Sequence, residues 1–517
     1  MSARTPSSVR WVRFTMLIGL AMLVLPAGGA LAWGVLTSFA DGAIDPPSVR
    51  VLLRTLGVSL GIGMLAAACA WAPARVISAR RGRTLRGLVL VPLLMPPYLV
   101  YSGYSIVRDP SWFIGDFLEQ LAAQGMSWVT IGLGRVLAIW GLALWAFPIA
   151  ALLLAGSMPG ADVDDALRLD APAWRRTCER VRMNRAGVFA SVAAVGLVML
   201  GSAVPLHLAQ IETLAIDLWR RLSETSPEQW GSVWLAGWPI YLPAVVGAAW
   251  APSLVRRLAQ NTDGLACAPV VSTREQAIAW IVWACAVIIP LILFVSSVRN
   301  IGSLVEFWRL SGPGVVAAVQ NGLATAVLTA AVALALTIVM SASPVAAVRT
   351  SSVVLAVMVF AAIMPGVFIG AALARTGASM PSFMSDLLAV DAYVLRFGCV
   401  PLIAGAAAVL AEPADVRALR TLEGCDGVRG WAEACLPRLG PVVLVAAAAA
   451  GLMAFHEIEA SVMLVPPGRE NLARQILGYL HFSRMEEMAA ASVYLLGGGV
   501  LAGVVISRII ISQFKGS

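Results

Sequence analysis

The stretch VRALRTLEGCDGVRGWAEACLPRLGP, residues 416 to 441, decides the fold because an earlier stretch repeats its spacing. The earlier stretch is DDALRLDAPAWRRTCERVRMNRAG, residues 164 to 187. Three pairs of positions align at one common offset: Ala171 with Gly424, Asn184 with Pro437, and Gly187 with Gly440. Each stretch begins amphipathically, reaches a small residue and then turns, which predicts a short surface helix in each loop. The shared spacing predicts an internal repeat.

The chain around these two loops has the composition of an integral membrane protein. Of its 517 residues, 59% are hydrophobic and 13% are charged, and the mean hydropathy is +0.83. Soluble domains carry about 25% charged residues, so a water-soluble fold is excluded. Apolar runs long enough to cross a bilayer fall near 14–36, 54–76, 85–107, 136–158, 187–209, 230–254, 276–297, 314–340, 351–374, 391–411, 440–464 and 488–512. We therefore predict an all-α integral membrane fold with about 12 transmembrane helices.

The runs divide into two halves that we interpret as tandem six-helix repeats. The first repeat covers 1–260 with its loop at 159–186, and the second covers 261–517 with its loop at 412–439. The third run of each half has Met-Pro at its middle, at Pro96 and Pro365. Proline bends a helix and frees a carbonyl that lipid cannot satisfy, so we expect both bends to face other protein.

The distribution of arginine predicts the orientation in the membrane, because basic loops stay in the cytoplasm. Arginines gather in alternate loops, at 75–86, 168–185, 256–274, 349, 417–438 and 508. Four arginines run against this pattern: Arg220, Arg221, Arg299 and Arg309. The positions of most arginines predict that both termini are cytoplasmic. We attribute the net charge of +8 to basic cytoplasmic loops and not to nucleic-acid binding.

Several kinds of chemistry have no residues to support them. The cysteines form no CxxC pair and the three histidines no HExxH motif, so we expect no metal site and no cofactor. A Walker A loop needs a lysine for the phosphates, and the only lysine is Lys515. Any ATP hydrolysis would therefore take place in a separate subunit, and we predict no catalytic residue in this chain.

With these loops, the chain resembles the permease subunits of binding-protein-dependent ABC importers, whose loop carries Glu-Ala-Ala, three residues, Gly and a later Leu-Pro. It looks most like the fused, double-length permeases of the ferric-iron type, a group that includes thiamine permeases. The stretch HEIEASVMLVPPGRENLARQILGYLHFSRMEEMAAAS, residues 456 to 492, carries that group's pattern. The resemblance covers nearly the whole chain and implies a multi-pass protein of the bacterial plasma (inner) membrane.

The resemblance implies that both loops dock on two copies of an ATPase subunit. The residues expected to couple are Asp165, Ala166, Ala171, Trp174 and Arg175 in the first loop, and Ala418, Gly424, Leu436 and Pro437 in the second. Each loop keeps only part of the pattern. Ala171 replaces the glycine and Met183-Asn184 the Leu-Pro in the first loop, and Ala418 replaces the acid in the second. A basic loop held by anionic lipid is the alternative.

Glu457 is the main candidate for the translocation pathway, because an ionisable group inside a span is costly and is usually functional. A carboxylate solvated at the outer interface, or bonded to the following Pro-Pro-Gly turn, is the alternative. Asn321, Pro96 and Pro365 are further pathway candidates. Pro467, Gly468 and Glu470 belong to an outer loop expected to contact a periplasmic binding protein.

Two other functions compete with the importer permease. An ion-coupled secondary transporter would be expected to carry acids in both halves, but Val204 stands opposite Glu457. A membrane-embedded enzyme would need an acid-base or metal cluster near a span end. A permease-like protein with degenerate ATPase coupling remains open, as does the solute. Ferric iron is the first expectation, and thiamine or another small solute is the second.

Overall fold

The computed structural model describes residues 7–40, 46–79, 83–158, 161–170, 172–260, 271–298, 300–342, 344–378, 384–423, 425, 427–464, 472–482 and 484–513. Throughout this described part the chain forms helices and turns and no strand, as the sequence predicts. Eight helices are long and apolar enough to cross a bilayer, and the number rises to twelve if each of four sharply bent helix pairs is one span. All twelve apolar runs are therefore accounted for by helices among the described residues.

The helices form two compact units, and each unit draws on both halves of the sequence. Unit 1 contains 1–46, 218–263 and 316–471. Unit 2 contains 47–217, 264–315 and 472–517. These units cut across the boundary expected at residue 260, so that boundary does not separate two compact bodies. The boundary between the two repeats stays a prediction.

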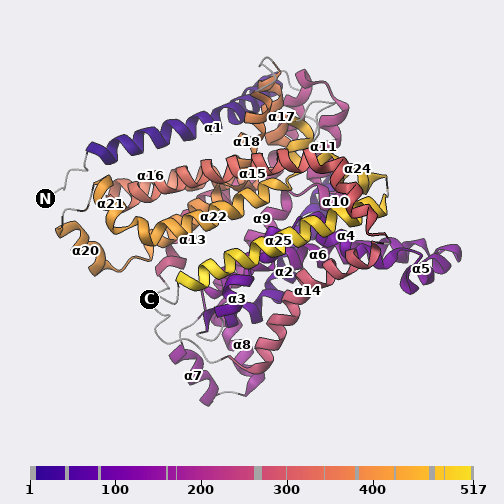
Figure 1. The fold of residues 1–517 in the computed structure, drawn as a ribbon, viewed down its shortest axis with the longest axis horizontal. Helices are drawn as coiled ribbons and strands as arrows, with labels where there is room; N and C mark the ends of the chain where they lie inside the picture. The colour runs from indigo at the N-terminus through magenta and orange to yellow at the C-terminus, as the bar shows by residue number, and fades with distance from the viewer. Residues whose placement is uncertain are drawn as a thin grey trace. The chain divides into compact units, whose positions relative to one another are not determined.

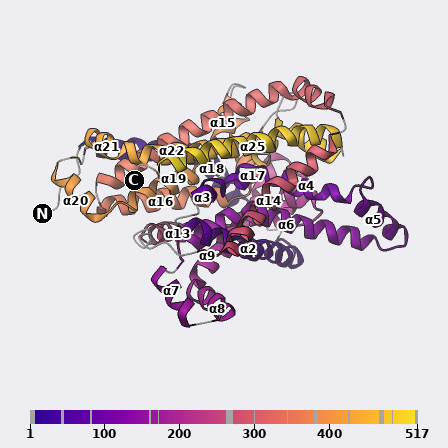
Figure 2. The same ribbon diagram turned by 60° about the horizontal axis from the view of Figure 1, so that its bottom comes forward.

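Unit 1 is a bundle that contains several long helices (Figure 1). Its helices are α1 (Ser7–Ala40), α12 (Trp230–Ala236), α13 (Trp238–Gln260), α15 (Gly302–Ala342, from Val316), α16 (Pro344–Ile363), α17 (Gly366–Gly377), α18 (Met384–Phe397), α19 (Cys399–Leu410), α20 (Ala414–Leu422), α21 (Val428–Ala434), α22 (Leu436–Phe455) and α23 (Glu459–Leu464). Aliphatic side chains such as Leu20, Leu336 and Val443 form its core. α20 and α21 lie at the same end of the unit as the start of α1 (Figures 1 and 2).

Unit 2 contains the remaining long helices. They are α2 (Val49–Ser78), α3 (Arg83–Leu88), the 3-10 turn η2 (Val91–Leu94), α4 (Pro97–Ser105), η3 (Ile106–Arg108), α5 (Phe113–Ala123), α6 (Ser127–Ala155), α7 (Ala161–Asp170), α8 (Ala173–Met183), α9 (Arg185–Leu200), α10 (Val204–Leu208), α14 (Thr273–Ser297), α24 (Leu472–His481) and α25 (Met485–Gln513). The helix α11 (Leu214–Glu224) crosses from this unit into unit 1, and the turn η4 (Pro227–Gln229) follows it. α5 lies at one end of unit 2 and the pair α7 and α8 at another (Figure 2).

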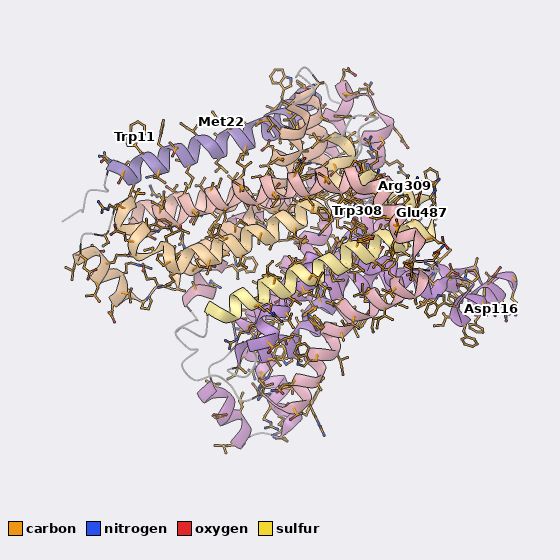
Figure 3. The ribbon with its side chains drawn as sticks, in the orientation of Figure 1. Trp11, Met22, Asp116, Trp308, Arg309 and Glu487 are labelled. Atoms are coloured by element: carbon orange, nitrogen blue, oxygen red, sulfur yellow. The ribbon has the colours of Figure 1, made fainter. Side chains whose placement is uncertain are left out.

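Large apolar side chains cover the outside of several long helices. Trp11 and Met22 on α1 are 67% and 71% exposed, and Trp308 on α15 is 51% exposed (Figure 3). In water such apolar surfaces would promote aggregation, but in a bilayer they contact lipid tails that are equally apolar. This surface agrees with a multi-pass membrane protein.

The predicted runs 187–209 and 440–464 are not single helices. α9 ends at Leu200 and α22 at Phe455, and a short break precedes α10 and α23. Gly201 and Ser202 occupy the first break, and His456 and Glu457 the second. Polar or glycine residues favour an end to the helix at these points. Both halves therefore break their fifth apolar run close to its end.

Candidate functional site

The two Met-Pro pairs lie at the two sharpest of the four bent helix pairs found among the described residues. The arms 84–94 and 97–108 meet at 84° around Pro96, and the arms 349–363 and 366–377 meet at 100° around Pro365. Met95 and Met364 are both buried, at 0% and 3% exposure. The expected bends are therefore present, and both are packed inside protein, as the freed backbone groups require.

In unit 2, a neutral hydrogen bond satisfies the freed backbone at the bend. The indole Nε1 of Trp145, on α6, donates to the carbonyl oxygen of Met95 at 2.9 Å. Around it, α4 packs on α6 and α10, and α10 contributes the buried apolar side chains of Val204 and Leu206. The contacts described here are therefore apolar packing and a neutral hydrogen bond.

In unit 1, a carboxylate faces the corresponding backbone. α17 begins at Gly366, whose N–H donates to Oε2 of Glu459 at 3.4 Å. The same oxygen accepts from Nη1 of Arg396, on α18, at 2.8 Å. The positive end of the helix dipole of α17 and the guanidinium therefore share one carboxylate.

Glu457 joins the same group from the break between α22 and α23. Its Oε1 lies 3.5 Å from Nη1 of Arg396, and its Oε2 accepts from the N–H of Ala460 at 3.0 Å and of Ser461 at 3.3 Å. The carboxylate thus caps the N-terminus of α23. Glu457 is 6% exposed, so the alternative of a carboxylate solvated at the outer interface is excluded.

We call Arg396, Glu457 and Glu459, with Ser461 and Tyr393, the charged cluster. The Tyr393 hydroxyl and Ser461 Oγ lie 2.8 Å apart, and Ser461 Oγ donates to the Glu457 carbonyl oxygen. One guanidinium therefore faces two carboxylates. Such a group could attract a cation, or could exchange ion-pair partners when the bent helix moves.

The remaining pathway candidates separate between the units. Pro365, Asn321 and Glu457 belong to unit 1, whereas Pro96 belongs to unit 2. Asn321 is half-buried in α15, and the neighbouring Gly322 packs closely on the backbone of Gly451 near the end of α22. Pro467, Gly468 and Glu470 lie outside the described residues, and α24 is the short helix expected to follow them.

Each loop expected to couple contains two short helices rather than the one predicted. α7 and α8 form the first loop, and α20 and α21 the second. Ala171 and Gly424 fall between the helices of each pair but lie outside the described residues. The other coupling candidates that the structure describes are exposed: Asp165, Ala166, Trp174, Arg175, Ala418, Leu436 and Pro437.

Both loops expose the same apolar pattern. The exposed residues Val163, Ala166 and Leu169 follow one another at intervals of three along α7. Val416, Leu419 and Leu422 do so along α20. We call these two sets the apolar triplets. They occupy aligned positions of the two loops, and Leu169 and Leu422 are 88% and 83% exposed.

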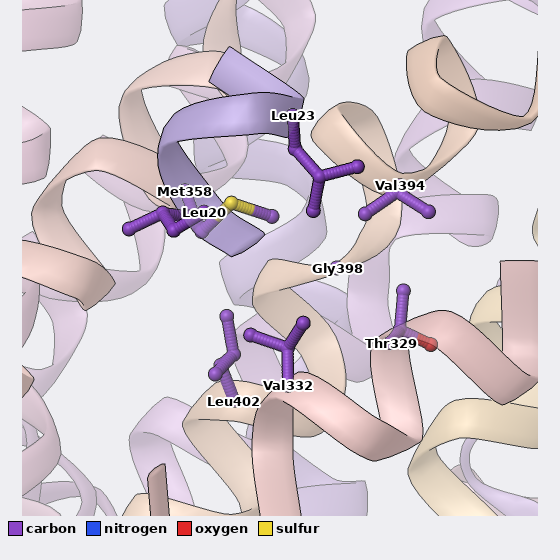
Figure 4. Close-up of a pocket in the computed structure, with 8 residues that line it drawn as sticks. All are labelled: Leu20, Leu23, Thr329, Val332, Met358, Val394, Gly398 and Leu402. Carbon is purple, nitrogen blue, oxygen red and sulfur yellow. The ribbon is translucent and has the colours of Figure 1, made fainter. Parts of the chain in front are cut away.

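A small pocket in unit 1 has a different character. Leu20 and Leu23 of α1, Val332 of α15 and Leu402 of α19 line it, and Thr329 supplies a hydroxyl (Figure 4). Its walls carry no ionisable side chain. This pocket is an apolar packing defect and has no chemistry to offer a charged solute.

Arg396 and Trp145 are the residues at the bends that our sequence reasoning missed. Arg396 lies within the apolar run 391–411, and a charge inside such a run is itself a signal of function. Trp145 carries no such signal, because tryptophan is ordinary in a membrane span. No known protein family, curated protein or solved structure matches this chain.

Proposed function

We propose that this chain is the membrane-spanning permease subunit of an ABC importer, built from two tandem six-helix repeats. Separate ATPase subunits would bind its cytoplasmic loops, and a periplasmic binding protein would deliver a small solute. Lys515, the only lysine, is unsuited to a Walker A loop, which agrees with ATP hydrolysis outside the chain.

The apolar triplets are the observation that carries this proposal. Leu169 and Leu422 expose apolar surface that is unfavourable in water. Exposed apolar patches indicate interaction sites, so both triplets favour contact with a partner. An amphipathic helix that places its apolar face in a groove presents side chains at intervals of three or four, as both triplets do. Two such helices at aligned positions fit two copies of one partner better than they fit an irregular lipid surface.

The composition of the two units supports the tandem repeat. Unit 1 holds the first and sixth spans of the first half, α1 and α13, with spans two to five of the second half. Unit 2 holds spans two to five of the first half with α14 and α25, the first and sixth spans of the second. This reciprocal exchange is expected if both halves descend from one six-helix unit.

The charged cluster supports a pathway role for the second half. Glu457 and Glu459 are buried beside the bend at Pro365, where a rocking motion of α17 would alter their contacts with Arg396. Two buried carboxylates beside the bend favour a positively charged solute, and ferric iron is our first choice. In unit 2 the corresponding joint is apolar, so we propose that the two halves contribute unequally.

Copurification of an ATPase tests the proposal. The chain is tagged in its native host, solubilised, and compared with Leu169→Asp and Leu422→Asp. We expect a bound ATPase with the wild type, and a loss on the order of tenfold or more with either variant, because an aspartate in an apolar groove is desolvated without a partner.

The matched control is Thr421→Asp, which adds the same charge to α20 at an exposed polar position. It is expected to leave the amount of bound ATPase unchanged. If the wild type brings down no ATPase, the importer proposal is wrong. If only anionic lipid copurifies and the Leu→Asp variants release it, the loops are lipid anchors.

A further inference from the structure

A second ionic group, with two buried arginines and a partly exposed glutamate, lies in unit 2, away from both bends. Arg75 in the last turn of α2 is 3% exposed, and its Nε lies 2.6 Å from Oε1 of Glu275. Arg180 of α8 is 9% exposed, and its Nη1 lies 3.9 Å from the same oxygen. One carboxylate oxygen therefore faces two guanidinium groups from two other helices.

The other oxygen of Glu275 has a separate task. Oε2 accepts from the N–H of Ser272 at 2.9 Å, and Ser272 Oγ accepts from the N–H of Glu275 at 3.2 Å. These reciprocal bonds form a capping box at the start of α14. The capping box holds the carboxylate in place, so that Oε1 can remain directed at the arginines.

The group joins segments that are distant in sequence. α8 belongs to the first loop, α2 to the first half, and α14 is the first span of the second half. In unit 1 the buried Arg420 of α20 donates at 3.2 Å to Glu412 and to the carbonyl oxygen of Ser341, both in the second half. The ionic group of the first loop therefore joins both halves of the sequence, whereas these contacts of Arg420 stay within the second half.

We propose that Glu275 is a positioning residue that fixes α8 to the ends of α2 and α14. A displacement of the first loop then moves a span of the second half directly, because buried opposite charges resist separation more than exposed pairs do. The transport consequence rests on the proposed function, whereas the position of α8 does not. Glu275 would thus be a coupling element outside the loops themselves.

Glu275→Gln separates the two tasks of the side chain. Glutamine preserves the capping box, since its amide oxygen accepts from the backbone, but it removes the charge that holds Arg75 and Arg180. Ser272→Ala is the matched control, because it removes the hydroxyl of the cap and leaves the carboxylate. Glu275→Asp keeps the charge and tests for rescue.

Two measurements follow in lipid nanodiscs. The first is the spin-label distance between Cys178 on α8 and Ala277→Cys on α14, both exposed, with the other cysteines replaced by alanine. We expect Glu275→Gln to broaden the distribution and shift it to longer distances, Ser272→Ala to leave it near that of wild type, and Glu275→Asp to restore it in part. An unchanged distribution in Glu275→Gln overturns the inference.

The second measurement is ATP hydrolysis by the ATPase that copurifies with each variant. We expect Glu275→Gln to retain the bound ATPase, because Leu169 and its triplet are intact, but to lose stimulation of hydrolysis by the solute-loaded binding protein. Full stimulation in Glu275→Gln would overturn the coupling role. If wild type binds no ATPase, the proposed function fails, and the distance measurement still decides whether Glu275 positions α8.

Discussion

At the bend before α4, a neutral indole of Trp145 donates to the carbonyl of Met95, whereas at the bend before α17 a carboxylate of Glu459 accepts from the amide of Gly366. Both solutions satisfy a backbone group that lipid would leave unpaired. They differ in how much they depend on their neighbours. Glu459 requires Arg396, because a buried carboxylate without a counter-charge is strongly unfavourable, while the indole requires no third group.

The difference suggests a division of tasks between the units. In unit 2 the contact at the bend is a neutral hydrogen bond from Trp145 to Met95 instead of an ion pair. In the charged cluster of unit 1, Nη1 of Arg396 lies within reach of both Glu457 and Glu459, so this joint depends on charge. Three predictions test this contrast, in order of decreasing effect.

The largest effect is expected from Arg396→Met. It removes the guanidinium that both Glu457 and Glu459 face, and breaking a buried ion pair in this way costs about 3–5 kcal/mol. The free energy of unfolding, measured by SDS titration in mixed micelles, should fall by that amount. Arg309→Met, which removes an exposed partner of Glu306, is the control and should leave it unchanged. A normal stability in Arg396→Met would mean that the cluster does not hold the bend.

A smaller loss is expected from Trp145→Phe. Phenylalanine keeps most of the packing on α4 but leaves the buried Met95 carbonyl unsatisfied, which costs about 1–3 kcal/mol. The same titration measures it, beside Trp128→Phe, whose side chain is 70% exposed. If Trp145→Phe proves as damaging as Arg396→Met, the contrast between neutral and ionic joints is wrong.

The smallest effect is expected from Tyr393→Phe. It removes the hydroxyl beside Ser461, whose Oγ keeps its bond to the Glu457 carbonyl, so the loss should be about 0.5–1.5 kcal/mol. Thermal unfolding midpoints resolve such a difference when they are compared with Tyr494→Phe, which removes a long, exposed hydrogen bond to the Leu304 carbonyl oxygen. A loss equal to that of Arg396→Met would place Tyr393 at the centre of the cluster instead of at its edge.

Much of the architecture could be read from local pattern. Apolar runs located the helices that can span the membrane, because length and hydropathy are properties of contiguous residues. The bends at Pro96 and Pro365 follow from the chemistry of proline, which acts on its own helix. The amphipathic pattern of the two loops predicts surface helices. It does not predict that each loop contains two helices instead of one.

The partners of the buried polar groups could not be read in this way. Glu457 was recognised as unusual from its place in an apolar run, but its pairing with Arg396 joins residues from different helices. The bond from Trp145 to Met95 and the ion pair between Arg75 and Glu275 have the same origin. Sequence by itself determined which segments are helical and which residues cannot remain unpartnered in a membrane, since both depend on local chemistry. Only the tertiary structure decided which groups meet, because helix packing brings together residues whose separation along the chain carries no record of their contact.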